Sequence, residues 1–425
     1  MHHKNKSQAA NLALACSSAL LVASSGVQAS GFAIPELSIA GLATSNALVA
    51  NHEVLGAIPY NPAAMSFHEG SSAALGTILI QPDLAVDTGS GTVDSEGNDL
   101  VAIPAISAHD TLNEEWSLGI SVNAPFGLET DWETDVFGDQ YPVGSFMPTQ
   151  TKLEIVAFSP SASYKLNDQA ALAIGVDYYW MREVLFNSVL NDGNAYPGFN
   201  LEGDGQGVGF NLGGLLVVDS WSFGLSYHSS SKIKAEGTLD DDVGVLPSTL
   251  SDEVTATLEL PWRLQIGARY EATEKLAIEF DFTRTGWNKF DTLEVKNEQF
   301  GSNIFTSVND FDNASAYRLG ITYDFTKATQ LRIGYTFDET PQGDDYFSPR
   351  VPDADRQLYS LGVGHTIDDG WTFDVGYMYV DFDKRTVDSS KAAVVGEELN
   401  GTTAVNGTYD SSVHLFGLGV TKTFM

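Results

Sequence analysis

Histidine, serine and acidic residues are the side chains in this chain that could support acid–base or nucleophilic chemistry. The six histidines beyond residue 29 are scattered, with no spacing typical of a metal site. A Ser-His-acid lipase site would have to use His228 or His365, but each lies in an alternating segment where a structural histidine is more common. We therefore predict no catalytic residues, no enzyme activity, no metal and no cofactor. The histidines are His52, His68, His109, His228, His365 and His414.

Cysteine usage and charge exclude further classes of chemistry. The single cysteine, Cys16, lies in an N-terminal segment that we expect to be removed. Without it, thiolate nucleophiles, thiolate metal sites and disulfides are all excluded. The formal net charge of −34 argues against nucleic acid as a partner, because phosphate contacts need Lys and Arg. The acids of 87–99 and 240–242 lack EF-hand spacing, so we interpret them as solvated loops.

The N-terminus has the order of a secretory signal peptide. Lys4 and Lys6 give it a positive start, a mostly apolar run follows over 9–22, and Val27-Gln28-Ala29 ends in a small-x-small site. We therefore expect residues 1–29 to be cleaved and the mature chain to leave the cytoplasm.

Large apolar residues alternate with small or polar ones along much of the remaining chain. The pattern is clear in Trp221–His228 and recurs in 359–364 and 371–379. Successive residues of a strand point to opposite faces, so each such segment has one apolar face. After Ser30 no apolar run approaches the roughly 18 residues of a membrane helix. A membrane crossing would then require a closed barrel, in which every backbone hydrogen bond is satisfied without water.

The segments between these strands alternate between long and short. Long connections such as 126–150 and 289–313 are rich in Gly, Asn, Asp and Ser, whereas Asn167-Asp168 and Asp219-Ser220 are tight turns. A soluble β-sandwich gives no reason for this asymmetry, but an outer-membrane barrel does. We predict an all-β, antiparallel transmembrane barrel of 14 strands over residues 70–425, with extracellular long loops and both termini periplasmic. The predicted strands lie near 70–85, 99–111, 116–125, 151–166, 170–188, 207–218, 221–238, 253–270, 276–288, 314–325, 330–341, 356–367, 371–386 and 409–424.

Residues 30–69 precede the first strand and do not alternate. They are small, irregular and apolar, with Phe32, Ile34 and Leu37 among them. A fourteen-stranded barrel is wide enough to need filling, since eight strands already leave room only for side chains or one small ligand. We therefore predict that this segment plugs the lumen. The alternative is a disordered periplasmic leader, which its apolar content disfavours.

Several motifs occur in an order and spacing known from one family. Gly31-Phe32 and Asn61-Pro62-Ala63-Ala64-Met65 lie in the N-terminal segment, and 123–128 and 352–356 follow along the chain. In these motifs the chain resembles the FadL family, outer-membrane transporters of long-chain fatty acids and, in some branches, aromatic hydrocarbons. The resemblance covers essentially the whole mature chain and implies a fourteen-stranded barrel with an N-terminal hatch. It also implies sideways release through the barrel wall near a strand interruption. As functional hatch residues we predict Phe32, Asn61, Pro62 and Ala63.

The chain departs from the family at the positions that hold a carboxylate. The resemblance implies basic residues deep in the lumen, but the aligned positions are Asn187 and Asn309, which carry no charge. Arg182 lies nearby, yet it is displaced from Asn187 by five positions, an odd number, which predicts that it points to the other face. Arg182 stays a ligand candidate. The missing cations favour a neutral hydrocarbon, or a cation placed elsewhere.

The predicted loop 126–150 is unusually apolar for a water-facing segment. Phe126, Leu128 and Trp132 could form a capture groove, because exposed apolar clusters usually mark binding surfaces. Alternatively, they pack under other loops. Each buried methylene contributes roughly 0.8 kcal/mol, so an acyl chain could bind without a charged partner.

These patterns together predict passive transport of a hydrophobic small molecule across the outer membrane of a Gram-negative bacterium. Long-chain fatty acids are the first substrate class, and neutral aromatic or aliphatic hydrocarbons are the alternative. A general porin should have a charged lumen and no apolar plug, and a lipid hydrolase needs Ser, His and an acid to converge at one interface. The other expected partners are outer-membrane lipid and lipopolysaccharide, and we expect a monomer.

Overall fold

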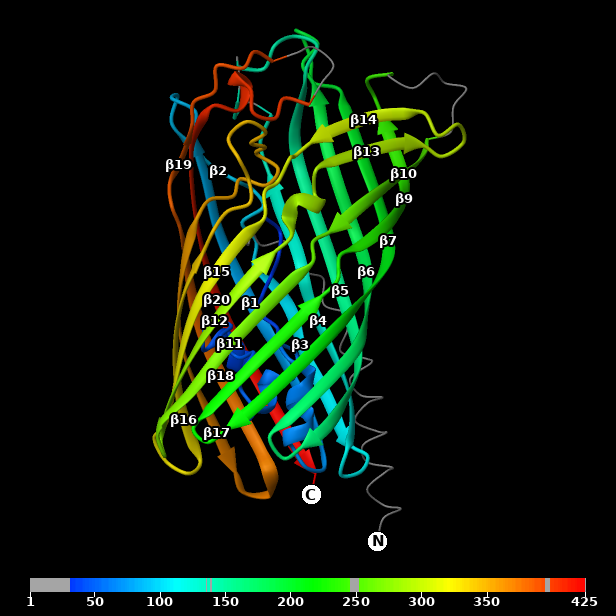
Figure 1. The fold of residues 1–425 in the computed structure, drawn as a ribbon. Coiled ribbons are helices and arrows are strands. Elements are labelled where there is room, and N and C mark those ends of the chain that lie inside the picture. The colour runs from blue at the N-terminus through cyan, green and yellow to red at the C-terminus, as the bar shows by residue number, and fades with distance from the viewer. Residues whose placement is uncertain (1–30, 135, 138–139, 245–251, 394–397, 425) are drawn as a thin grey trace.

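The chain folds into one closed, antiparallel β-barrel (Figure 1). Strand β1 (Ser71–Asp87) pairs along its whole length with strand β20 (Gly407–Phe424). Closure removes the free sheet edges, which lipid cannot hydrogen-bond. The barrel therefore meets the requirement for spanning a membrane with strands. The computed structural model describes residues 31–134, 136–137, 140–244, 252–393 and 398–424.

The described residues form fourteen barrel strands, which confirms the predicted fold class. Four of these strands consist of two consecutive segments, namely β8 with β9, β10 with β11, β12 with β13, and β14 with β15, whereas β2 and β19 are short extracellular additions. The remaining segments are β2 (Thr92–Asp94), β3 (Val101–Thr111), β4 (Trp116–Asp131), β5 (Phe146–Asn167), β6 (Ala170–Leu190), β7 (Gly198–Val218), β8 (Trp221–His228), β9 (Ser231–Asp241), β10 (Glu253–Leu260), β11 (Arg263–Thr273), β12 (Leu276–Thr285), β13 (Thr292–Asn297), β14 (Asn303–Val308), β15 (Ala314–Asp324), β16 (Thr329–Asp338), β17 (Arg356–Ile367), β18 (Trp371–Phe382) and β19 (Arg385–Val387).

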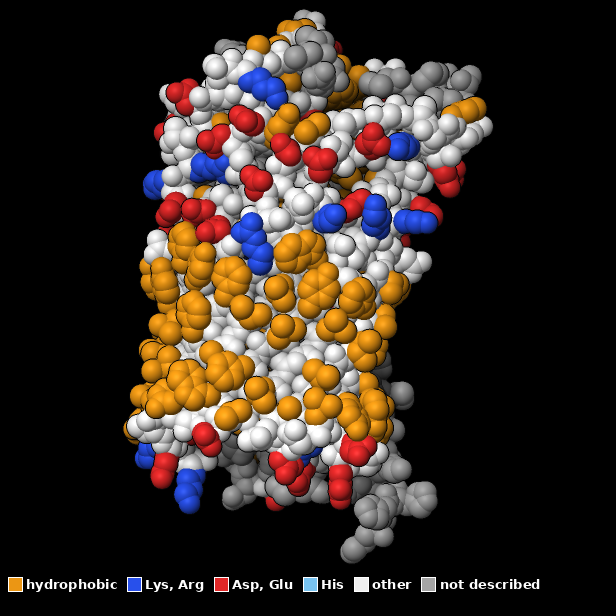
Figure 2. Space-filling model, in the orientation of Figure 1, with side chains coloured by type: hydrophobic (Ala, Val, Ile, Leu, Met, Phe, Trp, Pro, Cys, Tyr) orange, Lys and Arg blue, Asp and Glu red, His pale blue; other side chains and the backbone are white. Residues whose placement is uncertain are grey.

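The period-two pattern places apolar side chains on the outside of the barrel. On β6, Leu172 and Ile174 are 54% and 60% exposed, while Ala171 and Ala173, which alternate with them, face the interior and are buried. Figure 2 shows the result as an apolar band around the barrel, with charged side chains above and below it. A band of this kind is what lipid contact requires.

One side of the barrel is regular. Strands β15, β16, β17, β18 and β20, here called the continuous wall, pair without a register shift. Inward glycines on this wall, such as Gly334 and Gly362, lie directly against the N-terminal segment. Small side chains thus let the two backbones approach closely.

The opposite side, from β3 to β11, is here called the interrupted wall. Register shifts occur between β4 and β5, β5 and β6, and β6 and β7. The strand made of β8 and β9 breaks at Ser229-Ser230, and the neighbouring strand breaks at Pro261-Trp262. Proline cannot donate to a ladder, which accounts for the second break.

Residues 31–69, here called the hatch, fill the lumen near the end that carries the C-terminus (Figure 1). The hatch contains a short α2 helix (Ile39–Leu42) and the 3-10 helices η1 (Leu55–Ala57) and η2 (Pro62–Phe67). Ser38 caps α2 by accepting a hydrogen bond from Gly41.

No helix among the described residues is both long enough and apolar enough to cross a membrane. The predicted signal peptide, residues 1–29, lies outside the described residues.

Three predicted strand ends are wrong by five residues or more, each compared with the segment in which it lies. The strand predicted over 207–218 begins at Gly198. The strand predicted over 116–125 continues to Asp131, and the one predicted over 151–166 begins at Phe146. The predicted loop 126–150 therefore shrinks to 132–145. Beyond the bulge in β4, both faces are covered by protein, so period-two alternation no longer marks the strand.

Candidate functional site

The pairing between β3 and β4 stops partway along the two strands. Its last pair is Ala105↔Asn123, although both strands continue beyond it. Between Asn123 and Phe126, β4 holds one residue more than the facing stretch of β5. This bulge falls at Ala124-Pro125, where proline provides no N–H for pairing. The barrel wall is thus open between β3 and β4 on the extracellular side of the bulge.

The start of the hatch takes the place beside β4 that β3 leaves. The Ile34 amide donates to the Pro125 carbonyl oxygen at 2.8 Å, and the Gly127 amide donates to the Phe32 carbonyl oxygen at 3.0 Å. These bonds satisfy backbone groups that the break would otherwise leave unpaired. The start of the hatch is therefore hydrogen-bonded to β4 at the interruption in the wall.

A cavity of about 610 Å³ lies at this interruption. Buried side chains such as Ile34 and Phe126 line it from inside, while Leu75 and Leu418, which are exposed on the barrel exterior, line it from outside. The lining is mostly apolar. This cavity, here called the wall cavity, connects the lumen with the lipid-facing surface.

Inside the barrel, an aromatic cluster surrounds the first hatch residues. The Phe32 ring lies 4.7 Å from that of Trp287 and 5.1 Å from that of Phe290, centroid to centroid. Phe126 and Phe311 extend the cluster on either side. This packed region, here called the apolar chamber, borders the wall cavity, because Phe126 belongs to both.

Asn61 ties the hatch to itself and to the barrel. Its Nδ2 donates to the Val49 carbonyl at 2.8 Å and to the Gly214 carbonyl of β7 at 2.9 Å. Its Oδ1 accepts from the Ala63 amide at 3.2 Å and caps η2, where Pro62 occupies the first turn. The Asn-Pro-Ala motif thus fixes the turn that packs on the interrupted wall.

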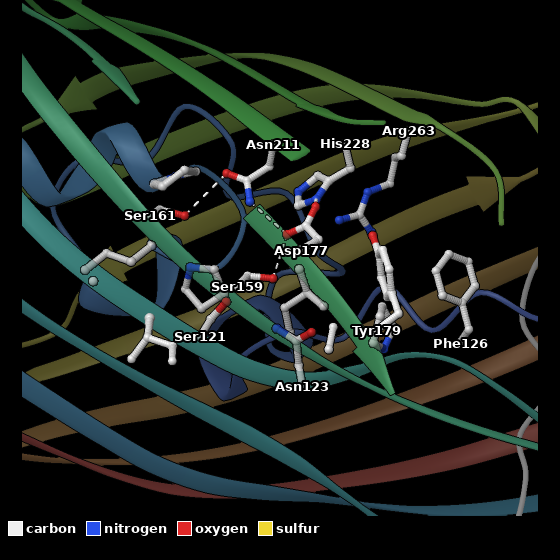
Figure 3. Close-up of a pocket in the computed structure, with 18 of the residues that line it drawn as sticks. Ser121, Asn123, Phe126, Ser159, Ser161, Asp177, Tyr179, Asn211, His228 and Arg263 are labelled. Carbon is white, nitrogen blue, oxygen red and sulfur yellow. Dashed lines mark hydrogen bonds and ion pairs between the residues drawn. The ribbon is translucent and has the colours of Figure 1, made fainter. Parts of the chain in front are cut away.

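A pocket of about 60 Å³ lies between the hatch and the interrupted wall (Figure 3). Most of its lining is apolar, but it is here called the polar pocket for the charged and hydrogen-bonding side chains that meet in it. Its polar lining comes from different strands and includes Ser159, Asp177, Asn211, His228 and Arg263. Phe126 also lines this pocket, which places it next to the apolar chamber. The sequence analysis interprets His228 as a structural histidine and does not single out Asp177 or Arg263, because their proximity arises only from the register of the strands.

The residues predicted to capture solute are buried. Phe126 and Leu128 lie on β4 in the apolar chamber, rather than in a loop. Trp132 is 1% exposed, and its Nε1 donates to the Pro349 carbonyl at 2.8 Å. Trp132 therefore packs under other loops, which was the alternative to a capture groove for this segment.

Arg182 lines the wall cavity. Its guanidinium lies 3.5 Å from the Glu154 carboxylate and 5.8 Å from the centroid of the Trp180 ring. The bulge in β6 between Met181 and Val184 interrupts the alternation from which its facing was predicted. Its charge is opposed by Glu154.

Arg350, which sequence reasoning missed, lies next to Asn187. Its Nη1 donates to the Asn187 carbonyl at 3.0 Å, and its Nε donates to Glu398 Oε1 at 2.6 Å. Asn309, the other aligned position, is buried against the backbone of Ser307. Burial lowers the pKa of Arg350, and the ion pair with Glu398 opposes that change. This cation comes from a long loop and already forms an ion pair with Glu398. No local sequence pattern predicts its position.

One cluster has potential metal ligands. His52, Glu53 and Glu271 each place a ligand atom within 4.8 Å of the others. However, Glu53 pairs with Arg269, and the His52 Nδ1 bonds to Ser222 Oγ at 3.0 Å. Two of the three groups therefore have protein partners.

Comparison with known proteins places this architecture. The family model described as "Outer membrane protein transport protein (OMPP1/FadL/TodX)" matches residues 20–424. The long-chain fatty acid transport protein of Escherichia coli O6:H1 is 24% identical, over 93% of this chain and 96% of its own length. A FadL homologue from Pseudomonas aeruginosa shares the fold with a TM-score of 0.78 at 20% identity, over 93% of this chain and all of the other. The toluene transporter TodX of Pseudomonas putida gives 0.69 at 16% identity with the same coverage.

Proposed function

Because the chain belongs to the OMPP1/FadL/TodX family of outer-membrane transporters of hydrophobic molecules, we propose that its substrates are long-chain fatty acids. The observation that carries the proposal is the apolar wall cavity at the interruption between β3 and β4, which borders the apolar chamber at Phe126. Support for the substrate class comes from a full-length relative named as a long-chain fatty acid transport protein. Fatty acids combine a chain that suits an apolar route with a carboxylate that suits the adjoining polar pocket.

The proposed route runs from the extracellular loops to the lipid-facing surface. A solute enters the apolar chamber, where each buried methylene contributes roughly 0.8 kcal/mol to binding. It then passes Phe126 into the wall cavity and leaves between β3 and β4. Passage from the chamber into the wall cavity and exit between β3 and β4 need no energy source, because the solute moves between apolar environments.

The hatch residues control this route in the proposal. Phe32 closes the chamber from below, packed between Trp287 and Phe290. Asn61, with Pro62 and Ala63, holds the rest of the hatch against the barrel. Movement of the segment bonded to Pro125 would connect or separate the chamber and the wall cavity.

The predicted ligand residues take different roles. Phe126 and Leu128 contact the solute in the chamber, and Arg182 borders its exit from the wall cavity. Trp132 lies in a separate apolar cluster under the extracellular loops, where it holds the Pro349 segment.

Neutral hydrocarbons are the second candidate substrate class. Asn187 and Asn309 carry no charge, Arg350 is neutralised by Glu398, and a toluene transporter shares the fold. A lumen built for benzene-like solutes would need no cation.

Uptake separates the candidates. Cells that lack their own transporter are given this gene or an empty vector, and uptake of radiolabelled oleate, a matched alkane and toluene is measured. Gene-dependent oleate uptake supports the proposal. Hydrocarbon uptake without oleate uptake moves the substrate to the neutral class, and faster entry of small sugars alone would indicate a porin.

A further inference from the structure

The polar pocket is formed by inward side chains from consecutive strands of the interrupted wall. Asn211 of β7 pairs in register with His228 of β8, and His228 pairs with Arg263 of β11. Ser159 of β5 and Asp177 of β6 continue this row. The row crosses the wall at the level where β8 and β10 end, so the strand breaks and the pocket coincide.

The acid of this row already has a full set of partners. Asp177 Oδ1 accepts from Ser159 Oγ at 2.7 Å and from Asn211 Nδ2 at 2.8 Å. Asp177 Oδ2 lies 2.8 Å from His228 Nδ1. A carboxylate with three close donors needs no further cation.

Arg263 is the unmatched member of the row. Its guanidinium makes no hydrogen bond or ion pair within 4.0 Å with any residue in the described part of the chain. Figure 3 shows its side chain reaching into the pocket beside Tyr179 and toward Asp177. Four buried arginines of the described residues do have carboxylate partners. These pairs are Arg269 with Glu53, Arg332 with Asp374, Arg350 with Glu398 and Arg356 with Asp338.

A half-buried guanidinium without a hydrogen-bonded acceptor is costly, because water solvates it only partly and the Asp177 carboxylate acts on it only from beyond ion-pair distance. Its planar array of donors matches a carboxylate in bidentate geometry. An anion that enters the pocket would therefore gain more at Arg263 than at an arginine that already has a partner.

The pocket opens where an acyl chain could continue. Phe126 and Pro125 line it on the side of the wall cavity, and Pro62 and Met65 of the hatch close it opposite. A volume of about 60 Å³ suits a headgroup and its first methylenes, because liquid water occupies about 30 Å³ per molecule. The chain beyond the headgroup would lie along Phe126.

We propose that Arg263 is the ligand for the substrate's carboxylate, in a headgroup subsite between the hatch and the break in β4. This inference rests on the proposed transport of fatty acids. It identifies a cation that differs from those expected at Asn187 and Asn309. The headgroup then waits at the hatch while the acyl chain occupies the route to the wall cavity.

The test compares binding of oleate with binding of oleyl alcohol, its neutral analogue, to purified full-length barrel in detergent. Wild type should prefer oleate, and Arg263→Gln should weaken oleate binding about ten- to a hundredfold, as expected for loss of a charge-assisted contact, while binding of oleyl alcohol is unchanged. Arg263→Lys should keep much of the preference. Arg284→Gln is the matched control, because it removes a half-buried arginine that lines neither the polar pocket nor the wall cavity, and it should leave the preference intact. Arg182→Gln tests the other cation that borders the proposed route.

Several outcomes would overturn the inference. An unchanged preference in Arg263→Gln, or its loss in Arg182→Gln instead, would remove Arg263 as the ligand while leaving fatty-acid transport in place. Equal losses for both ligands in Arg263→Gln and Arg263→Lys would show that the residue acts on folding alone. Failure of the proposed function has a different signature, since wild type would then take up toluene or alkane but no oleate.

Discussion

The continuous wall and the interrupted wall hold the same hatch in different ways. On the continuous wall, Ser45 Oγ donates to Ser360 Oγ at 2.9 Å, Thr336 Oγ1 donates to the Ser45 carbonyl at 2.9 Å, and Gly334 lets the hatch backbone lie against the sheet. On the interrupted wall, the hatch start pairs with the bulge at Pro125. The continuous wall thus provides a fixed seat. The interrupted wall also anchors the hatch through Asn61, but at the bulge it provides an exchangeable strand contact with the start of the hatch.

The difference indicates where movement costs least. Displacing the hatch from the continuous wall would leave buried polar groups without partners. At the bulge, only a few backbone bonds join the hatch to β4, and an apolar cavity lies beside them. A solute can replace apolar contacts there without breaking the barrel.

Of the variants that test this difference, deletion of Pro125 should have the largest effect on oleate uptake, because it changes the interrupted wall itself. It removes the extra residue of β4, so β4 and β5 regain equal spacing between Asn123 and Phe126 and the wall can close. We expect oleate uptake to fall to the level of the empty vector, measured with radiolabelled oleate.

The matched control is Pro125→Ala, which keeps the extra residue and should keep most uptake. Both variants are checked for heat-modifiable migration in gels, which reports a folded barrel. Wild-type uptake by a folded deletion variant would show that the interruption is not the exit.

Gly334→Val should have the second-largest effect, because it changes the contact between the hatch and the continuous wall. A Cβ at this position would collide with the backbone of Thr44 and Ser45. We expect the hatch to be displaced, which would be seen as maleimide labelling of a cysteine introduced at Ala57, a buried hatch position. Gly214→Val is the control, since its Cβ would meet only Leu172 at 3.7 Å. Equal labelling of the two variants would contradict a distinct seat on the continuous wall.

Asn61→Ala should have a smaller effect. It removes two donated hydrogen bonds and the cap of η2, a loss of about 1–3 kcal/mol in the free energy that holds the hatch. Asn61→Ser keeps a capping oxygen but cannot donate to both carbonyls, so it should fall between wild type and Ala. Both variants are compared with wild type in thermal unfolding and oleate uptake. Identical results for Asn61→Ser and wild type would show that Asn61 acts through capping alone.

The same two walls divide what could be predicted from the sequence. On the continuous wall, the predicted strand 356–367 coincides with β17, and 314–325 differs from β15 by one residue. On the interrupted wall, the prediction ended β4 six residues early, at 125, because residues 123–128 are all buried and alternation disappears. Period-two reasoning works where one face meets lipid and fails where protein covers both.

The residues of the candidate site also differ in whether the sequence predicts them. Family motifs pointed to Phe32 and Asn61, which the structure places at the chamber floor and at the hatch anchor. The polar pocket could not be predicted, because its members come from different strands and meet only through their register. One local signal for Arg263 did exist, since it follows Pro261, the residue that breaks the strand.

Photolabelling tests the sideways route most directly. A fatty acid with a diazirine near its methyl end is bound to the purified barrel, irradiated, and mapped by mass spectrometry with and without excess unlabelled oleate. Competed labels should fall on β3, β4 and β5 around the wall cavity and on the apolar chamber, and the Pro125 deletion should lose those in the wall cavity. Competed labels confined to β15–β18, or absent from the wall cavity in wild type, would contradict release through the interrupted wall.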